Sequence, residues 1–188
     1  KNLERLFAEK LLKIKAIKLQ PANPFTWASG WKSPFYCDNR KTLSYPSLRN
    51  FVKIEITRLI LERFGQVDAI AGVATGAIPQ GALVADALNR PGMKVVVVED
   101  LISTGGSSLK AVEAIRRDGC EVIGMVAAYT YGFPVAEEAF KNAKVTLVTL
   151  TNYEAVLDVA LRTGYIEKED IQTLNEWRKD PAHWDAEK

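Results

Sequence analysis

Hydrophobic and polar positions follow two alternating patterns along the chain. Short apolar runs rich in β-branched residues predict strands at residues 68–73, 94–98, 121–128 and 145–150. Each run is followed by apolar residues at helical spacing, which predict helices at 77–89, 106–118, 134–141 and 152–162. Because strands alternate with helices, we expect an α/β fold, a parallel sheet flanked by helices with right-handed crossovers.

The segments at either end extend this core. A first amphipathic helix is predicted by the apolar positions Leu3, Leu6, Phe7, Leu11 and Ile14. Residues 17–38 are rich in proline and aromatic residues and favour short strands and turns. Pro46 begins a further helix, and residues 168–178 a last short one. We expect one domain over 1–188, with a small N-terminal part at 1–43 and the α/β core at 44–188.

Composition narrows the function classes. Of the 188 residues, 47% are hydrophobic, which is enough to form a hydrophobic core. The net charge of +2 is too small to indicate bulk nucleic-acid binding. No apolar run in the sequence is long enough to span a bilayer, and from the first residues we expect no signal peptide. Cys37 and Cys120 lie far apart, as expected of reduced thiols in a cytoplasmic protein. His183 is the only histidine, which disfavours a histidine-based triad.

The segment from residue 95 to residue 107 carries the strongest chemical signal. Four valines predict a strand buried on both faces, and Glu99 and Asp100 follow them directly. Because carboxylates are rarely buried without partners, we expect both to leave the core at the carboxyl end of the strand, where open α/β sheets bind ligands. The small residues 103–107 then open a helix, whose backbone N–H groups can surround a phosphate. Gly105 and Gly106 alone would indicate only an ordinary turn.

Taken together, this segment resembles the phosphoribosyl-diphosphate signature of the type I phosphoribosyltransferases. The resemblance implies that Glu99 and Asp100 act at the ribose hydroxyls, as the catalytic carboxylates. It implies Mg²⁺ as cofactor, held mainly by the substrate and near Asp100, with no strong protein ligand. The implied contacts to phosphoribosyl diphosphate are Glu99, Asp100, Leu101, Ile102, Ser103, Thr104, Gly105, Gly106 and Ser107, together with Thr75 and Gly76.

Thr75 and Gly76 form a second turn between a predicted strand and a predicted helix. By itself a Thr-Gly pair is weak evidence, but the resemblance places here the loop that touches the leaving pyrophosphate. Exposed N–H groups at a helix start make such a contact reasonable. Some relatives carry cationic residues where this chain has Ala28, Thr75 and Thr130, so those charged contacts do not carry over.

Residues 24–40 form a dense block of aromatic rings, hydroxyls and cations. Such a block often only fills a small subdomain. Its Ser-Gly-x-Lys-Ser-Pro-x-Tyr string, residues 29–36, resembles the N-terminal hood that covers the pyrimidine in bacterial orotate phosphoribosyltransferases. Residues 176–179 extend the match towards the end of the chain. The implied orotate contacts are Ser103, Lys32, Phe35 and Tyr36.

The resemblance implies transfer of ribose 5-phosphate from phosphoribosyl diphosphate to orotate in pyrimidine biosynthesis, by a homodimer without nucleic-acid or membrane partners. One alternative is a phosphoribosyltransferase for a purine or another base, against which the hood argues. The other is a non-catalytic RNA-binding regulator on the same fold, which would need a basic face that the charge distribution does not support.

The connection at Arg90 is shorter than the resemblance implies. Relatives place a strand and a long cationic loop between the positions of Asn89 and Gly92, where this sequence has only Arg90 and Pro91. We therefore predict that the intact protein weighs more than 20.9 kDa and that its additional residues lie at this connection. Intact mass spectrometry with peptide mapping measures both. A peptide running without interruption from Asn89 to Met93 would contradict the prediction.

Overall fold

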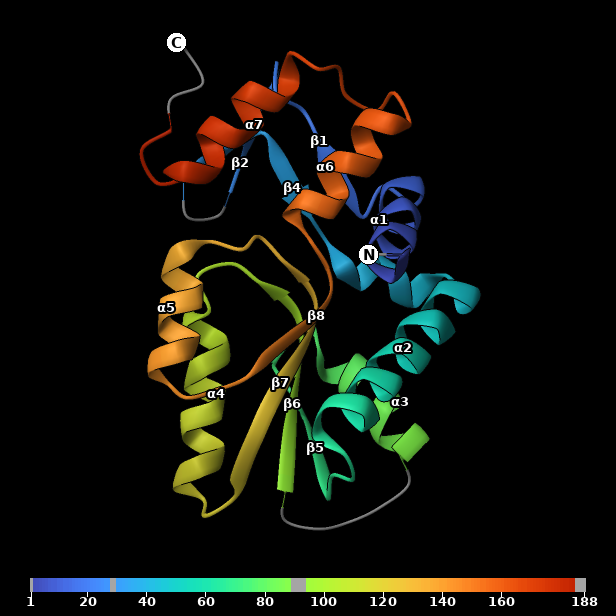
Figure 1. Ribbon diagram of the computed structural model, residues 1–188, viewed down its shortest axis with the longest axis vertical. Coiled ribbons are helices and arrows are strands. Elements are labelled where there is room, and N and C mark those ends of the chain that lie inside the picture. The colour runs from blue at the N-terminus through green and yellow to red at the C-terminus, as the bar shows by residue number, and fades with distance from the viewer. Residues whose placement is uncertain (1, 28–29, 89–93, 185–188) are drawn as a thin grey trace.

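A four-stranded parallel sheet forms the centre of the protein, as the alternation of strands and helices predicts. The structure is a computed structural model, and it describes residues 2–27, 30–88 and 94–184 (Figure 1). The strands lie in the order β5-β6-β7-β8 and pair in parallel throughout. Their bounds are β5 Ala69–Gly72, β6 Lys94–Ile102, β7 Glu121–Thr130 and β8 Leu147–Asn152.

Helices cover both faces of this sheet (Figure 1). On one face lie α2 Pro46–Phe64 and α3 Ile78–Leu88, and on the other α4 Gly106–Arg117 and α5 Pro134–Asn142. Val96 and Val98 belong to the hydrophobic cluster that contains α2, whereas Val97 belongs to the cluster that contains α4 and α5. All three are fully buried, so β6 is covered on both faces, as its uninterrupted valines predict.

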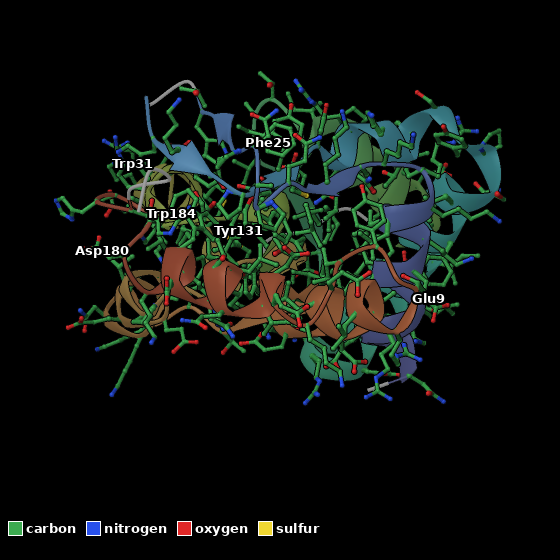
Figure 2. All side chains as sticks on the ribbon, turned by 90° about the horizontal axis from the view of Figure 1, so that it is seen from above. Glu9, Phe25, Trp31, Tyr131, Asp180 and Trp184 are labelled. Atoms are coloured by element: carbon green, nitrogen blue, oxygen red, sulfur yellow. The ribbon has the colours of Figure 1, made fainter. Side chains whose placement is uncertain are left out.

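Within residues 17–37, which we call the hood, the described strands form two small antiparallel two-stranded sheets above the carboxyl ends of the central sheet (Figure 1). One pairs β1 Ile17–Leu19 with β4 Phe35–Cys37, and the other pairs β2 Phe25–Thr26 with β3 Lys32–Ser33. The remaining elements are α1 Asn2–Lys13, the 3₁₀ helix η1 Asn39–Ser44, α6 Tyr153–Arg162 and α7 Asp170–Lys179. Seen from above, Trp31 of the hood and Trp184 near the C-terminus lie at the end opposite Glu9 (Figure 2).

The hood is packed against the last helix as well as against the sheet. The ring centroids of Trp27 and Trp177 lie 5.8 Å apart, edge to face. Residues from the hood, the sheet and α7 belong to one continuous hydrophobic cluster. The sequence division into 1–43 and 44–188 stays a prediction, but the packing joins the N-terminal segment to the far end of the chain.

The fold differs from the sequence prediction at several strand ends and at one short helix. β7 runs to Thr130 and β8 to Asn152, each two residues beyond the predicted end. Strand β6 runs on to Ile102 instead of ending at Val98, so Glu99 and Asp100 are strand residues. The 3₁₀ helix η1, which precedes α2, was not predicted. Of the helices in the described ranges, none has the length and apolar character needed to cross a bilayer.

Candidate functional site

Glu99 lies at the end of β6 in a buried, fully hydrogen-bonded setting. Its two carboxylate oxygens accept hydrogen bonds from Ser108 Oγ, at 2.7 Å, and from the backbone N–H of Asp100, at 2.9 Å. Its side chain is 5% exposed. The prediction that both carboxylates leave the core is therefore wrong for Glu99, because Ser108 in the first turn of α4 supplies the partner that a buried carboxylate needs.

Burial also changes the protonation of Glu99. Loss of solvation raises the pKa of its carboxyl group from the usual 4.5 to about 7, and the neighbouring Asp100 carboxyl acts in the same direction. The hydrogen bonds from Ser108 and from the Asp100 backbone favour the ionised form but do not outweigh burial. Near neutral pH, protonated and ionised Glu99 therefore coexist.

Asp100 occupies the junction between three segments. Asp100 follows Glu99 in the strand, so its side chain starts from the opposite face of β6, although its carboxyl group still interacts with that of Glu99. A Cβ at Gly76 would collide with the Asp100 carboxylate, so only glycine fits in the turn beside it. The amide of Asn39 donates to the Asp100 carbonyl oxygen at 2.6 Å. The structure thus brings the predicted Thr75–Gly76 turn and the carboxylate segment together.

The loop 103–107 begins α4 without a side-chain cap. Gly105, the N-cap residue, has φ +80°, and a Cβ there would lie 2.8 Å from the Phe140 ring. No acidic side chain occupies the first turn of the helix, whose N–H groups carry its positive end. Ser103 is half-buried and Thr104, Gly106 and Ser107 are exposed. This arrangement suits an anion, as the sequence predicts.

Two residues of the predicted signature contribute differently. The side chain of Ile102 is fully buried in the core, so only its backbone can face a ligand. Its carbonyl oxygen already accepts a hydrogen bond from the N–H of Tyr131 at 3.1 Å. Leu101 is half-buried. Within this segment, only the polar side chains and the backbone are therefore accessible to a ligand.

The structure corrects one predicted orotate contact. The Phe35 ring is fully buried and stacks on Tyr129 and Trp177, with centroids 5.7 Å and 6.3 Å apart, so it is a core residue and not a base-facing one. Tyr36, the next residue of β4, is half-buried beside Phe25. The Lys32 ammonium is exposed and donates to Thr26 Oγ1 at 3.1 Å within the same hairpin.

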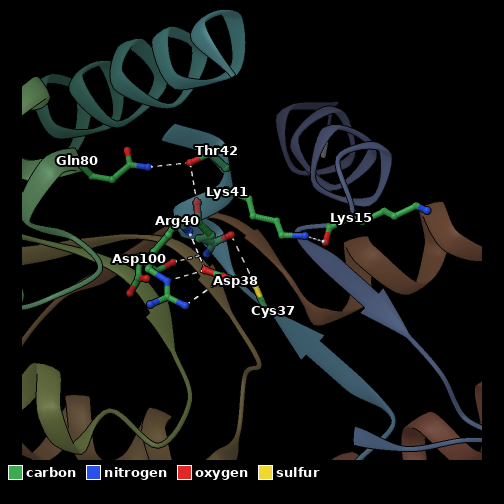
Figure 3. Close-up of polar contacts among 9 residues, drawn as sticks. Lys15, Cys37, Asp38, Arg40, Lys41, Thr42, Gln80 and Asp100 are labelled. Atoms are coloured by element: carbon green, nitrogen blue, oxygen red, sulfur yellow. Dashed lines mark hydrogen bonds and ion pairs between the residues drawn. The ribbon is translucent and has the colours of Figure 1, made fainter. Parts of the chain in front are cut away.

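A chain of hydrogen bonds that the sequence did not reveal supports this junction (Figure 3). Gln80 of α3 donates to Thr42 Oγ1 at 3.0 Å, and Thr42 donates to the carbonyl oxygen of Asn39 at 2.7 Å. The side-chain amide of Asn39 in turn donates to the backbone carbonyl oxygen of Asp100. The only signal in the sequence was the polar triplet 38–40 after the aromatic block, which gives no sign of the segment it contacts.

At Thr75 and Thr130, where some relatives carry cationic residues, this chain has uncharged side chains. Thr130 Oγ1 accepts a hydrogen bond from the N–H of Gly132 at 3.0 Å, which makes it part of a local turn. Thr75 is exposed. Ala28 and the connection 89–93 lie outside the described residues. In the ranges that are described, no three His, Cys, Asp or Glu side chains gather closely enough to hold a metal ion.

Glu99 gives a testable pH dependence of stability. The unfolded chain releases this proton near pH 4.5 and the folded chain near pH 7. The stabilising contribution is therefore complete below about pH 4.5 and is lost as the pH rises through about 7. We expect Glu99→Gln to remove this fall, as measured by urea unfolding across that range. The exposed Glu138→Gln serves as control, and an unchanged profile in Glu99→Gln would contradict the assignment.

Comparison with known proteins agrees with this geometry. The model of the phosphoribosyl transferase domain matches residues 80–162. An orotate phosphoribosyltransferase of Bacteroides thetaiotaomicron is 87% identical over 211 residues and covers 100% of both chains. One from Porphyromonas gingivalis is 60% identical over 98% of this chain and 99% of its own. The first alignment is 23 positions longer than the 188 residues printed here, so that relative has residues for which the printed sequence has none.

Solved structures share the fold. Orotate phosphoribosyltransferase from Aeropyrum pernix superposes with a TM-score of 0.73 at 26% identity, covering 84% of this chain and 99% of its own. The Mycobacterium tuberculosis enzyme in complex with 5-phospho-α-D-ribosyl 1-diphosphate gives a TM-score of 0.63 at 21% identity, covering 85% and 99%. With full-length relatives at 87% and 60% identity, the chain belongs to the orotate phosphoribosyltransferase family.

Proposed function

We propose that this protein transfers ribose 5-phosphate from phosphoribosyl diphosphate to orotate, giving orotidine 5-phosphate and pyrophosphate in pyrimidine biosynthesis. The observation that carries the proposal is the meeting of Asp100, the Thr75–Gly76 turn and the uncapped start of α4 at one edge of the sheet. The names of the full-length relatives support the same reaction.

The residues present fit the charge changes of this reaction. As the bond from ribose C1 to the diphosphate oxygen loosens, positive charge develops on the ribose and negative charge on the leaving group. The N–H groups of residues 103–107 hold the 5-phosphate and so fix the ribose. The carboxylate of Asp100 supplies negative charge beside the developing cation. No covalent nucleophile is required.

In this scheme Glu99 has a positioning role, because its side chain is buried. Its bond to Ser108 joins the end of β6 to the first turn of α4, the two elements that flank the phosphate loop. A direct contact of Glu99 with a ribose hydroxyl, as the family resemblance implies, would require that hydroxyl to compete with the Ser108 partner. The role at the ribose therefore falls first to Asp100.

Mg²⁺ as cofactor fits the partly exposed carboxylate of Asp100. Magnesium keeps several waters and is commonly bound through one or two carboxylates plus substrate phosphates. Asp100 offers one such oxygen ligand, while Glu99 is engaged by Ser108 and by backbone. When bound, the ion would neutralise charge on the leaving diphosphate.

We further propose that the hood covers the pyrimidine, with Tyr36, Lys32 and Ser103 as the remaining candidates for base contacts. A cytoplasmic homodimer without nucleic-acid or membrane partners completes the proposal. Its test is the consumption of phosphoribosyl diphosphate in the presence of orotate, uracil, hypoxanthine or an RNA hairpin. Consumption with orotate alone supports the proposal, and consumption with hypoxanthine alone, or hairpin binding without turnover, would replace it.

The Asp100→Asn variant tests the proposed catalytic carboxylate. It keeps the shape of the side chain but removes the charge beside the ribose, and we expect turnover to fall about tenfold to a thousandfold. The thermal midpoint should change little, because the Asn39 contact uses the Asp100 backbone. Asp86→Asn, on an exposed carboxylate of α3, is the matched control. Unchanged turnover in the double variant Glu99→Gln, Asp100→Asn would refute this assignment.

The Gly106→Val variant tests the phosphate loop. The nearest atom to a Cβ at Gly106 is Thr104 Oγ1 at 3.9 Å, so the substitution fills space above the loop without the backbone strain expected at Gly105. We expect affinity for phosphoribosyl diphosphate, measured by calorimetry, to fall far more than affinity for orotate. Unchanged affinity for the diphosphate substrate would place the 5-phosphate elsewhere.

A further inference from the structure

The proposed reaction needs positive charge near the leaving diphosphate, and two positions where relatives carry cations, residues 75 and 130, are neutral in this chain. Residue 75 in the turn beside Asp100 is threonine, and Thr130 at the end of β7 is engaged in a local turn. A diphosphate carries several negative charges, which a site without bulk water stabilises through charge-assisted hydrogen bonds. A cation held at this junction would meet that need.

Arg40 is a cation on η1, the 3₁₀ helix that follows the hood. Its Nε and Nη2 atoms bond the two carboxylate oxygens of Asp38 at 2.7 Å and 3.1 Å, a bidentate pair that fixes the plane of the guanidinium. The side chain is nevertheless 62% exposed, so one face of the fork stays open to a ligand. Asp38 also accepts from the backbone N–H of Arg40, which anchors the start of η1.

The 3₁₀ helix η1, which carries Arg40, is hydrogen-bonded both to strand β6 and to helix α3. Asn39, the preceding residue, holds the carbonyl of Asp100 at the end of β6. Thr42, two residues on, accepts from Gln80 of α3, the helix that follows the Thr75–Gly76 turn. Figure 3 shows Arg40 between these two attachments, beside Asp100. Its backbone position is therefore set by the same segments that form the proposed diphosphate site.

The Arg40 guanidinium interacts electrostatically with acidic groups at this junction. Hydrogen bonds and charge from Asp38 raise the pKa of the Arg40 guanidinium, and Tyr36 and Asp100 add smaller contributions in the same direction. Arg40 is thus permanently charged and lies within electrostatic range of the catalytic carboxylate and of a candidate base contact.

Three other cations near the hood are directed elsewhere. The Lys41 ammonium donates to the carbonyl oxygen of Lys15 at 3.1 Å, away from Asp100. Lys32 bonds Thr26 within its hairpin. The guanidinium of Arg178 donates to the carbonyls of Tyr131 and Gly132. Arg40 is the cation whose placement matches the site.

We propose that Arg40 binds the diphosphate group of phosphoribosyl diphosphate at the junction of Asp100 and the Thr75–Gly76 turn, and that it supplies charge where residue 75 is neutral. The inference rests on the proposed function. The planar fork of arginine suits two phosphate oxygens, and its pairing with Asp38 means that little side-chain freedom is lost on binding. Because Asp38 pairs with Arg40, the guanidinium is not left as an unpaired charge when no ligand is bound.

Paired variants of two neighbouring cations test this role. Arg40→Ala and Lys41→Ala each remove one positive charge from η1, but only the first removes the proposed ligand. Calorimetry in the presence of Mg²⁺ measures binding of phosphoribosyl diphosphate, inorganic pyrophosphate and orotidine 5-phosphate, which contains no diphosphate. We expect Arg40→Ala to weaken the first two about tenfold to a hundredfold, as loss of a charged hydrogen bond does, and to leave the third within about twofold. Lys41→Ala should leave all three unchanged.

The remaining outcomes are decisive. Equal affinities in Arg40→Ala and Lys41→Ala, with a lowered thermal midpoint in the first, would make Arg40 only a structural partner of Asp38. Weakened binding of orotidine 5-phosphate, which carries the base, with unchanged pyrophosphate binding would assign Arg40 to the base instead and overturn the proposal. If the unaltered chain binds neither diphosphate ligand, the proposed function itself fails. Partial recovery in Arg40→Lys would confirm that charge is the cause.

Discussion

The end of strand β6 is the constraint on which the rest of the site depends. A strand sends successive side chains towards opposite faces, so the two adjacent carboxyl groups meet different neighbours although they still interact with each other. Glu99 turns towards α4 and is buried with Ser108, whereas Asp100 turns towards Gly76 and lies beside η1. One carboxylate is therefore tied to the start of α4 inside the protein, and the other stays partly exposed at the junction with Gly76. The alternation of the backbone, rather than any special residue, divides the two roles.

The segments with continuous or periodic hydrophobic patterns were predictable from the sequence. Each strand of the sheet was located to within a few residues at its start, because valine and isoleucine runs have few other stable placements. The errors lie where a polar or aromatic residue finds a distant partner. Glu99 is buried because Ser108 folds back onto it, and Phe35 is buried because Tyr129 and Trp177 enclose it. Such contacts depend on the assembled fold and leave no local pattern.

The hood is also held by residues remote in sequence. Trp177 packs edge-on against Trp27 and stacks on Phe35, so α7 completes a subdomain that begins before residue 40. Beside it, Arg178 holds the carbonyls of Tyr131 and Gly132, directly after the end of β7. The C-terminal helix thereby fixes both the hood and the strand end that face the proposed base site. The match of residues 176–179 to the family has a physical basis in this packing.

These contacts separate two requirements of the site. Shape is set by buried interactions: the Gly76 contact, the Glu99–Ser108 bond and the aromatic packing under the hood. Charge is carried by exposed groups, which keep their hydration until a ligand arrives and so avoid the cost of burying an unpaired ion. Arg40 illustrates this arrangement, because its neighbours Asn39 and Thr42 are buried and bonded while its own guanidinium stays at the surface. A threonine at position 75 is then tolerable, since positive charge can be supplied from η1 without altering the turn that Asp100 requires.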